Sequence, residues 1–92
     1  MNLTYVDGEN KGSVLLFALS TCGWCKKVKD LLDELNVEYD YIYADLTQGE
    51  EREELLVELK KYNSKISFPT LVINQSKTLI GYSPDEIKEY LA

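Results

Sequence analysis

Histidine is absent from the 92-residue chain, and cysteine occurs only twice. Acid–base catalysis by histidine is therefore excluded, and a mononuclear zinc site would need two carboxylates in addition to both cysteines. Secreted domains of this size usually carry more cysteines, so the small number indicates a reducing compartment, and we predict a cytoplasmic protein. Cysteine chemistry, carboxylate chemistry and binding without catalysis remain as classes of function.

Long hydrophobic runs and an excess of positive charge are also missing. The longest apolar stretch spans residues 14–19, far short of the roughly 18 to 20 residues of a membrane-spanning helix. The chain does not open with the basic and apolar segments of a secretory signal. Ten basic residues against sixteen acidic ones give a net charge of −6. Nucleic acids and anionic membranes attract cationic surfaces, so we expect neither as a partner.

The apolar pattern predicts one α/β domain over residues 1–92. Short runs rich in β-branched and aromatic residues are typical of strands, and the expected strands are residues 3–6, 13–19, 38–46, 71–73 and 78–80. The last two flank a polar segment and predict an antiparallel hairpin. A strand–helix–strand crossover makes the second and third strands parallel. We therefore predict a central mixed four-stranded sheet flanked by three helices, with residues 3–6 as an extra N-terminal strand.

Three helices are expected between or after these strands. The first follows Trp24 and shows apolar residues at helical spacing. The second begins at Thr47-Gln48-Gly49-Glu50, which has the spacing of a capping box. In the third, Ser83 is expected as the N-cap and Pro84 as the first helical residue. The residues of this last helix that are expected to face the core are Ile87, Tyr90 and Leu91.

Both cysteines lie in the segment Cys22-Gly23-Trp24-Cys25, between an expected strand and an expected helix. Their spacing on a helical turn puts the two Cβ atoms roughly 5 to 6 Å apart, so a modest adjustment would allow a disulfide. Cys25 is directed toward the apolar stripe of the helix, whereas Cys22 precedes the helix and remains open to water. The free N–H groups of the helix start, together with Lys26 and Lys27, favour a thiolate at Cys22.

Structural roles for the cysteines are the alternative. A disulfide that closes only four residues constrains the unfolded chain little, so it would be a poor structural link. Two inert buried thiols would rarely fall together at a strand–helix junction, and half of a zinc site would need a second chain to complete it. The position of the pair favours redox chemistry.

Three segments in order resemble the glutaredoxins, a family of the thioredoxin-fold superfamily. They are residues 17–25, which include Thr21 and both cysteines, residues 67–70, and residues 81–85. The resemblance covers about residues 13–92. It implies a thioredoxin-like (glutaredoxin) fold and a monomeric thiol–disulfide oxidoreductase without a tightly bound cofactor. Cys22 would attack a disulfide of a protein or a small molecule, and Cys25 would resolve the mixed disulfide.

The resemblance also implies which residues bind the substrate. The bond between Phe68 and Pro69 is expected to be cis, which would direct the Phe68 backbone toward the cysteines for pairing with an extended substrate. The other residues implied in substrate binding are Thr21, Trp24, Gly81, Tyr82 and Asp85. Trp24 either offers a flat apolar contact or packs against Val28. Tyr82 also fits a packing role, and the alternative for Asp85 is to complement the helix dipole.

Two departures from the family pattern concern the reductant. Many glutaredoxins carry a lysine, which holds a glutathione carboxylate, where this chain has Leu19, and a second glycine where it has Tyr82. The pattern around Tyr82 resembles redoxins that serve ribonucleotide reductase and are reduced by thioredoxin reductase. Both glutathione and a thioredoxin-reductase-type protein are therefore expected as candidate electron donors.

Gly23 supports an alternative function. Glutaredoxins with glycine after the first cysteine include forms that bridge a [2Fe–2S] cluster between two subunits with the help of glutathione. Such a cluster carrier must be a dimer, because one chain supplies only two thiolates. The alternative explanation is that Gly23 simply relaxes the tight turn.

Overall fold

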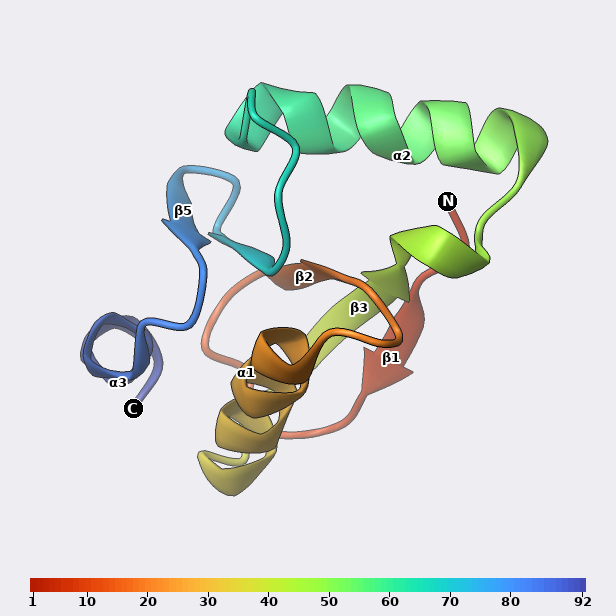
Figure 1. Ribbon diagram of the computed structural model, residues 1–92. Coiled ribbons are helices and arrows are strands. Elements are labelled where there is room, and N and C mark those ends of the chain that lie inside the picture. Colours follow the sequence, from red (N-terminus) through yellow and green to blue (C-terminus); the bar gives the residue numbers. More distant parts are fainter.

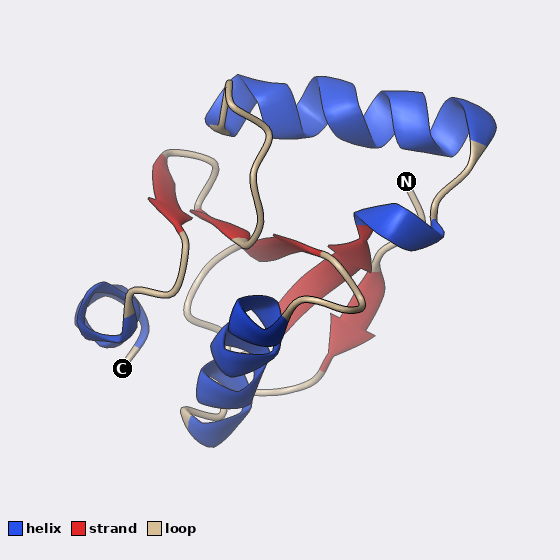
Figure 2. Cartoon of the chain, in the orientation of Figure 1, coloured by secondary structure: helices blue, strands red, loops and turns tan.

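The computed structural model describes all 92 residues, which form a five-stranded mixed sheet with helices on both of its faces (Figure 1, Figure 2). The strands are β1 (Thr4–Val6), β2 (Val14–Ala18), β3 (Tyr39–Tyr43), β4 (Thr70–Ile73) and β5 (Lys77–Ile80). The helices are α1 (Gly23–Glu34), the short 3₁₀ helix η1 (Ala44–Leu46), α2 (Gly49–Tyr62) and α3 (Pro84–Leu91). No helix combines the length and the apolar character needed to cross a membrane.

The sheet has the order β1-β3-β2-β4-β5. β2 runs parallel to β3 and antiparallel to β4, and β4 and β5 form an antiparallel hairpin. β1 joins the outer edge of β3 in antiparallel register. The predicted crossover, hairpin and extra N-terminal strand are therefore confirmed, and the chain has the thioredoxin-like fold.

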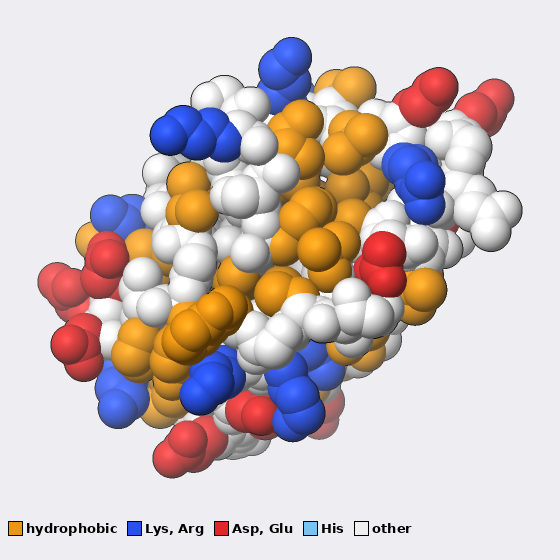
Figure 3. All heavy atoms as spheres, viewed as in Figure 1, with side chains coloured by type: hydrophobic (Ala, Val, Ile, Leu, Met, Phe, Trp, Pro, Cys, Tyr) orange, Lys and Arg blue, Asp and Glu red, His pale blue; other side chains and the backbone are white.

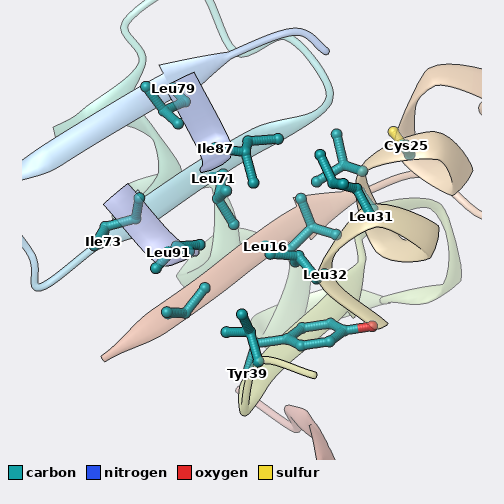
Figure 4. Packing of buried hydrophobic residues seen from close by; sticks show 14 residues of the cluster. Leu16, Cys25, Leu31, Leu32, Tyr39, Leu71, Ile73, Leu79, Ile87 and Leu91 are labelled. Carbon is teal, nitrogen blue, oxygen red and sulfur yellow. The ribbon is translucent and has the colours of Figure 1, made fainter. Parts of the chain in front are cut away.

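The sequence of the central strand β2 is apolar throughout because helices cover this strand on both faces of the sheet. Leu16 packs into a cluster with α1 and α3 on one face of the sheet, while its neighbour Phe17 packs against α2 on the other. Successive side chains of a strand point to opposite faces, so a strand covered on both sides needs no polar positions. Both side chains are completely buried, and each burial contributes roughly 1.5–3 kcal/mol. Figure 4 shows Leu16 beside Leu32 of α1, with Cys25 at the edge of the same cluster.

The strand expected over residues 38–46 is present but shorter, and the capping box expected at Thr47 was wrong. β3 ends at Tyr43, and a 3₁₀ turn follows it. The hydroxyl of Thr47 is buried and donates to the carbonyl oxygen of Ala44 at 2.7 Å, so it is not available to the N–H groups of α2. Gln48 is the N-cap instead, and its side chain makes no capping hydrogen bond.

The last helix begins as predicted, with Ser83 as the N-cap and Pro84 in the first turn, but the Ser83 side chain makes no capping hydrogen bond. Ile87 and Leu91 are buried, four residues apart on one stripe. The inward direction predicted for Tyr90 was wrong, because this residue lies beside the stripe and is 45% exposed. Its ring lies under the ammonium group of Lys77 at 5.2 Å.

Candidate active site

The two cysteines occupy the start of α1 in different environments. Cys22 is the N-cap residue, in extended conformation and partly exposed, and its Sγ accepts a hydrogen bond from the Cys25 N–H at 3.2 Å. Cys25 lies in the first turn, on the same buried stripe as Val28 and Leu32, and is only 1% exposed. Both thiols are free. The start of the helix therefore holds one sulfur that a partner can reach and one that lies in the core.

Burial also changes the acidity of the inner thiol. Removal from water, assisted by a hydrogen bond with Cys22, raises the pKa of Cys25 from 9.0 to about 12. A buried thiolate has lost its hydration, so the neutral thiol is the favoured form. In the reduced protein at neutral pH, Cys25 therefore retains its proton.

The two lysines that follow the cysteines are engaged by other groups. The ammonium of Lys26 lies 3.0 Å from the carboxylate of Asp30, one helical turn further on. The ammonium of Lys27 lies over the rings of Trp24 and Tyr82, 5.4 and 5.9 Å from their centroids. The positive charges of both lysines thus remain near the helix start, but the charge of Lys26 is paired with the carboxylate of Asp30.

A carboxylate that the sequence analysis did not identify also lies at this end of the sheet. Asp45 accepts hydrogen bonds from the backbone N–H of Ser20 at 2.8 Å and from the Ser20 hydroxyl. These bonds lower the pKa of Asp45. Because β2 and β3 are parallel, the residues that follow them meet at one edge of the sheet. The position of Asp45 shortly after an expected parallel strand was therefore the sequence signal that could have placed it near Ser20.

The loop before β4 faces the cysteine segment across a hollow of about 240 Å³. The bond between Phe68 and Pro69 is cis, as predicted, and the N–H and C=O groups of Phe68 take part in none of the hydrogen bonds of the chain. The Gly81 N–H donates to the Pro69 carbonyl oxygen at 2.9 Å and so joins the two loops. The residues that line the hollow are Trp24, Phe68, Pro69, Gly81 and Tyr82. Figure 3 shows hydrophobic side chains gathered on the face between α1 and α2.

The structure places the remaining predicted substrate residues as follows. Trp24 is 58% exposed and stacks on Tyr82, with the ring centroids 5.9 Å apart and the planes inclined by 28°. Tyr82 packs against the core with part of its ring and lines the hollow with the rest. Thr21 and Asp85 are exposed and do not line the hollow. Five of the seven residues are therefore brought together.

No three Cys, Asp or Glu side chains gather in a way that would hold a metal ion. The two cysteines are the only thiolate ligands that the chain offers. A shared metal or cluster would therefore need ligands from outside the chain.

A buried asparagine, which the sequence analysis also missed, holds the loop that carries Phe68 and Pro69. The side-chain amide nitrogen of Asn63 donates to the hydroxyls of Ser67 at 2.9 Å and Thr70 at 3.0 Å. The Thr70 hydroxyl in turn donates to the Ser67 carbonyl oxygen at 2.8 Å. Asn63 and Thr70 are both buried. The loop is thus tied to the end of α2 and to the start of β4 through a closed set of polar contacts.

Asn63→Ala is expected to lower the free energy of unfolding by about 2–3 kcal/mol, because the buried partners of the amide lose their hydrogen bonds without gaining water. Urea denaturation of both proteins measures the difference. Asn10→Ala is the matched control, because exposed Asn10 makes one hydrogen bond, to the Gly12 N–H, and its loss should cost about 0.5 kcal/mol or less. Equal losses in the two variants would contradict the role of the buried contacts.

Comparisons with known proteins agree with this geometry. The family model described as Glutaredoxin matches residues 14–77, a range that contains both cysteines and Pro69 but ends before Gly81. A glutaredoxin from Methanosarcina mazei Go1 is 43% identical, with a TM-score of 0.90 over 98% of this chain and 87% of that chain. Methanoredoxin from Methanosarcina acetivorans is 36% identical, with a TM-score of 0.88 over 92% of this chain and 90% of that chain. The Gene 56 protein of Mycobacterium phage D29 is 28% identical over 85% of this chain and 81% of that protein.

Proposed function

The chain belongs to the glutaredoxin family, and we propose that it reduces protein or small-molecule disulfides with the Cys22/Cys25 dithiol. The observation that carries the proposal is the asymmetry of the two free thiols. Cys22 is partly exposed and receives a hydrogen bond at its sulfur, whereas Cys25 is buried and holds its proton. A reachable nucleophile beside a protected second thiol is the arrangement that a two-step disulfide exchange needs.

The cycle begins with attack by the Cys22 thiolate on a substrate disulfide. A bond forms between Cys22 Sγ and one substrate sulfur, and the other substrate sulfur leaves as a thiolate and takes up a proton. Cys25 then gives up its proton and attacks Cys22 Sγ, which releases the second substrate sulfur. Two electrons have passed from the cysteines to the substrate, and a Cys22–Cys25 disulfide remains.

Four features at the start of α1 place a hydrogen-bond donor or positive charge near Cys22. The Cys25 N–H donates to its sulfur, and the positive end of the helix dipole lies at the same place. Lys26 and Lys27 add positive charge to this turn at longer range, although Asp30 shares that of Lys26. The hydrogen bond from the Cys25 N–H is thus the direct contact at the Cys22 sulfur that supports its role as the nucleophile.

An extended polypeptide is the substrate that the hollow lined by Trp24, Phe68 and Tyr82 suits best. The free N–H and C=O of Phe68 can pair with the main chain of a substrate, as the edge of a sheet does. Trp24 and Tyr82 offer a flat apolar surface for a neighbouring side chain, and Thr21 and Asp85 lie outside this hollow as additional polar contacts. One chain carries both thiols of the cycle, so a monomer suffices. A reducing compartment such as the cytoplasm would keep both thiols in the reduced form.

Trapping of the intermediate tests this mechanism. Cys25→Ser is expected to accumulate a mixed disulfide when it is mixed with a peptide that contains an internal disulfide, because the resolving thiol is gone. Mass spectrometry under non-reducing conditions should show a gain of one whole peptide mass. Cys22→Ser carries the same number of thiols and is the matched control, for which no adduct is expected. An adduct on Cys22→Ser but not on Cys25→Ser would reverse the assigned roles.

A further inference from the structure

The segment that connects α2 to β4 (Figure 1) carries the backbone groups available to an extended substrate. The N–H and C=O groups of Phe68 make no hydrogen bond within the chain. Its side chain packs against the core clusters on both faces of the sheet. The ring of Phe68 is thus anchored while its backbone groups are free, and their direction is set by the residues on either side.

Asn63, the C-cap residue of α2, is hydrogen-bonded to four of the residues that follow it. Its side-chain oxygen accepts the Lys65 N–H at 3.1 Å, and its carbonyl oxygen accepts the Ile66 N–H at 3.0 Å. Its side-chain nitrogen donates to the hydroxyls of Ser67 and Thr70. One buried side chain thus holds the segment on both sides of the free backbone groups.

Ile66 shows how firmly the segment is held. Its φ of 51° lies in the left-handed region, which β-branched residues rarely adopt because the Cβ atom comes too close to the backbone. Such a conformation persists only where the surrounding contacts over-determine it, and it is found mostly at active sites and ligand clamps. The contact that holds Ile66 comes from Asn63. The segment therefore has one conformation before a substrate arrives.

We propose that Asn63 is a positioning residue for the reduction of polypeptide disulfides. Through Ser67 and Thr70 it fixes the N–H and C=O groups of Phe68 in the direction that an extended substrate needs. The inference rests on the proposed function, because it concerns how a polypeptide is held while Cys22 attacks it. A segment that is already ordered removes the entropic cost of ordering it on binding, so a polypeptide binds more tightly. A small disulfide without peptide bonds gains nothing from this order.

The test compares a polypeptide disulfide with a small one. The first substrate is a short linear peptide whose single cysteine forms a disulfide with 2-mercaptoethanol. The second is bis(2-hydroxyethyl) disulfide, which has no peptide bond. Each is mixed in excess with reduced protein, and loss of the protein thiols is followed by acid quenching, alkylation and mass counting. The readout is the ratio of the second-order rate constants, peptide over small disulfide, because a change in the cysteines or in overall stability moves both rates alike.

Thr70→Val removes one of the two hydroxyls that Asn63 holds, while it keeps a buried, β-branched side chain. The ratio is expected to fall by about 3- to 10-fold, which corresponds to weakened hydrogen bonds between the substrate and Phe68. Thr47→Val is the matched control, because Thr47 is also buried and its hydroxyl donates to the Ala44 carbonyl oxygen, away from this segment. Its ratio should stay within about twofold of the wild-type value, as expected for an independent site.

A second pair of variants makes the comparison within the segment itself. Ser64 and Ser67 are both exposed, but only the Ser67 hydroxyl accepts a hydrogen bond from Asn63. Ser67→Ala is expected to lower the ratio by about 2- to 5-fold, and Ser64→Ala should leave it within about twofold. Substitutions at exposed positions rarely prevent folding, so this pair decides the question even where Thr70→Val does not fold.

An unchanged ratio in Thr70→Val and Ser67→Ala, or an equal fall in their controls, would overturn the positioning role of Asn63. Neither result would touch the proposed function, because the wild-type protein would still reduce both disulfides. Failure of the reduced wild-type protein to react with either disulfide would instead remove the proposed function itself. The two failures are therefore distinguishable in one set of reactions.

Discussion

Cys22→Ser is expected to lower disulfide-reducing turnover by about 1,000-fold or more, because a serine hydroxyl neither ionises at neutral pH nor forms a disulfide. The assay follows NADPH consumption with a small disulfide substrate. It is run once with glutathione and glutathione reductase and once with thioredoxin reductase, the two electron donors expected from the sequence. Turnover with only one of them identifies the reductant, and Cys22→Ser provides the blank for both.

A folding control belongs with this experiment. Cys22 is partly exposed at the N-cap of α1, so its replacement should change the free energy of unfolding by about 0.5 kcal/mol or less. Wild-type stability together with lost turnover would assign the effect to chemistry. Turnover retained by a folded Cys22→Ser protein would show that another group is the nucleophile.

The reduced protein is expected to lose stability as the pH rises above about 9. The raised pKa of Cys25 is expected to cause a measurable part of this loss. In the unfolded chain this thiol ionises near 9.0, whereas burial in the folded protein holds its proton to about 12. Between these values unfolding releases a proton, so raising the pH favours the unfolded state. The limit for one proton is about 1.4 kcal/mol per pH unit, and we expect about 0.5–1 kcal/mol per unit because solvent near the helix start screens the site.

Urea denaturation under reducing conditions at several pH values between about 8 and 11 measures this slope. Cys25→Ala should reduce the slope of the unfolding free energy against pH by the amount given above, whatever its absolute stability. Burial also raises the pKa of Tyr39, with help from a hydrogen bond to Asp33, so a residual slope of the same sign should persist in the variant. Identical slopes in wild type and Cys25→Ala would show that the buried thiol ionises equally easily in both states.

The position of the cysteine segment in the fold was open to prediction because its signals are local. The change from strand to helical periodicity at residues 19–24 placed Cys22 before α1 and Cys25 on its buried stripe, as the structure has them. The same holds for β2, whose uninterrupted apolar run predicted a strand covered on both faces. The cis bond at Pro69 followed only from the family resemblance, because an X–Pro bond is usually trans.

Local sequence patterns gave wrong predictions where a side chain could contact either of two partners. Thr47 has the spacing of a capping box, yet its hydroxyl bonds to the carbonyl oxygen of Ala44 in the preceding turn. Tyr90 lies within a helical period of Ile87, yet its ring lies against Lys77 of β5. In both cases the sequence pattern allowed two arrangements, and contacts made in the folded chain selected one.

The sequence by itself determined which atoms the proposed chemistry uses, that is, two thiols on one helical turn, with the first partly exposed and the second buried. It also determined the order of strands and helices, since periodicity and turn residues act over a few positions. Only the tertiary structure decided what surrounds the sulfur: Tyr82 against Trp24, Asp45 on Ser20, and Lys29 over Tyr41. Contacts of this kind depend on strand register and on how helices cross the sheet, and these are settled by packing of the whole core rather than by any short segment.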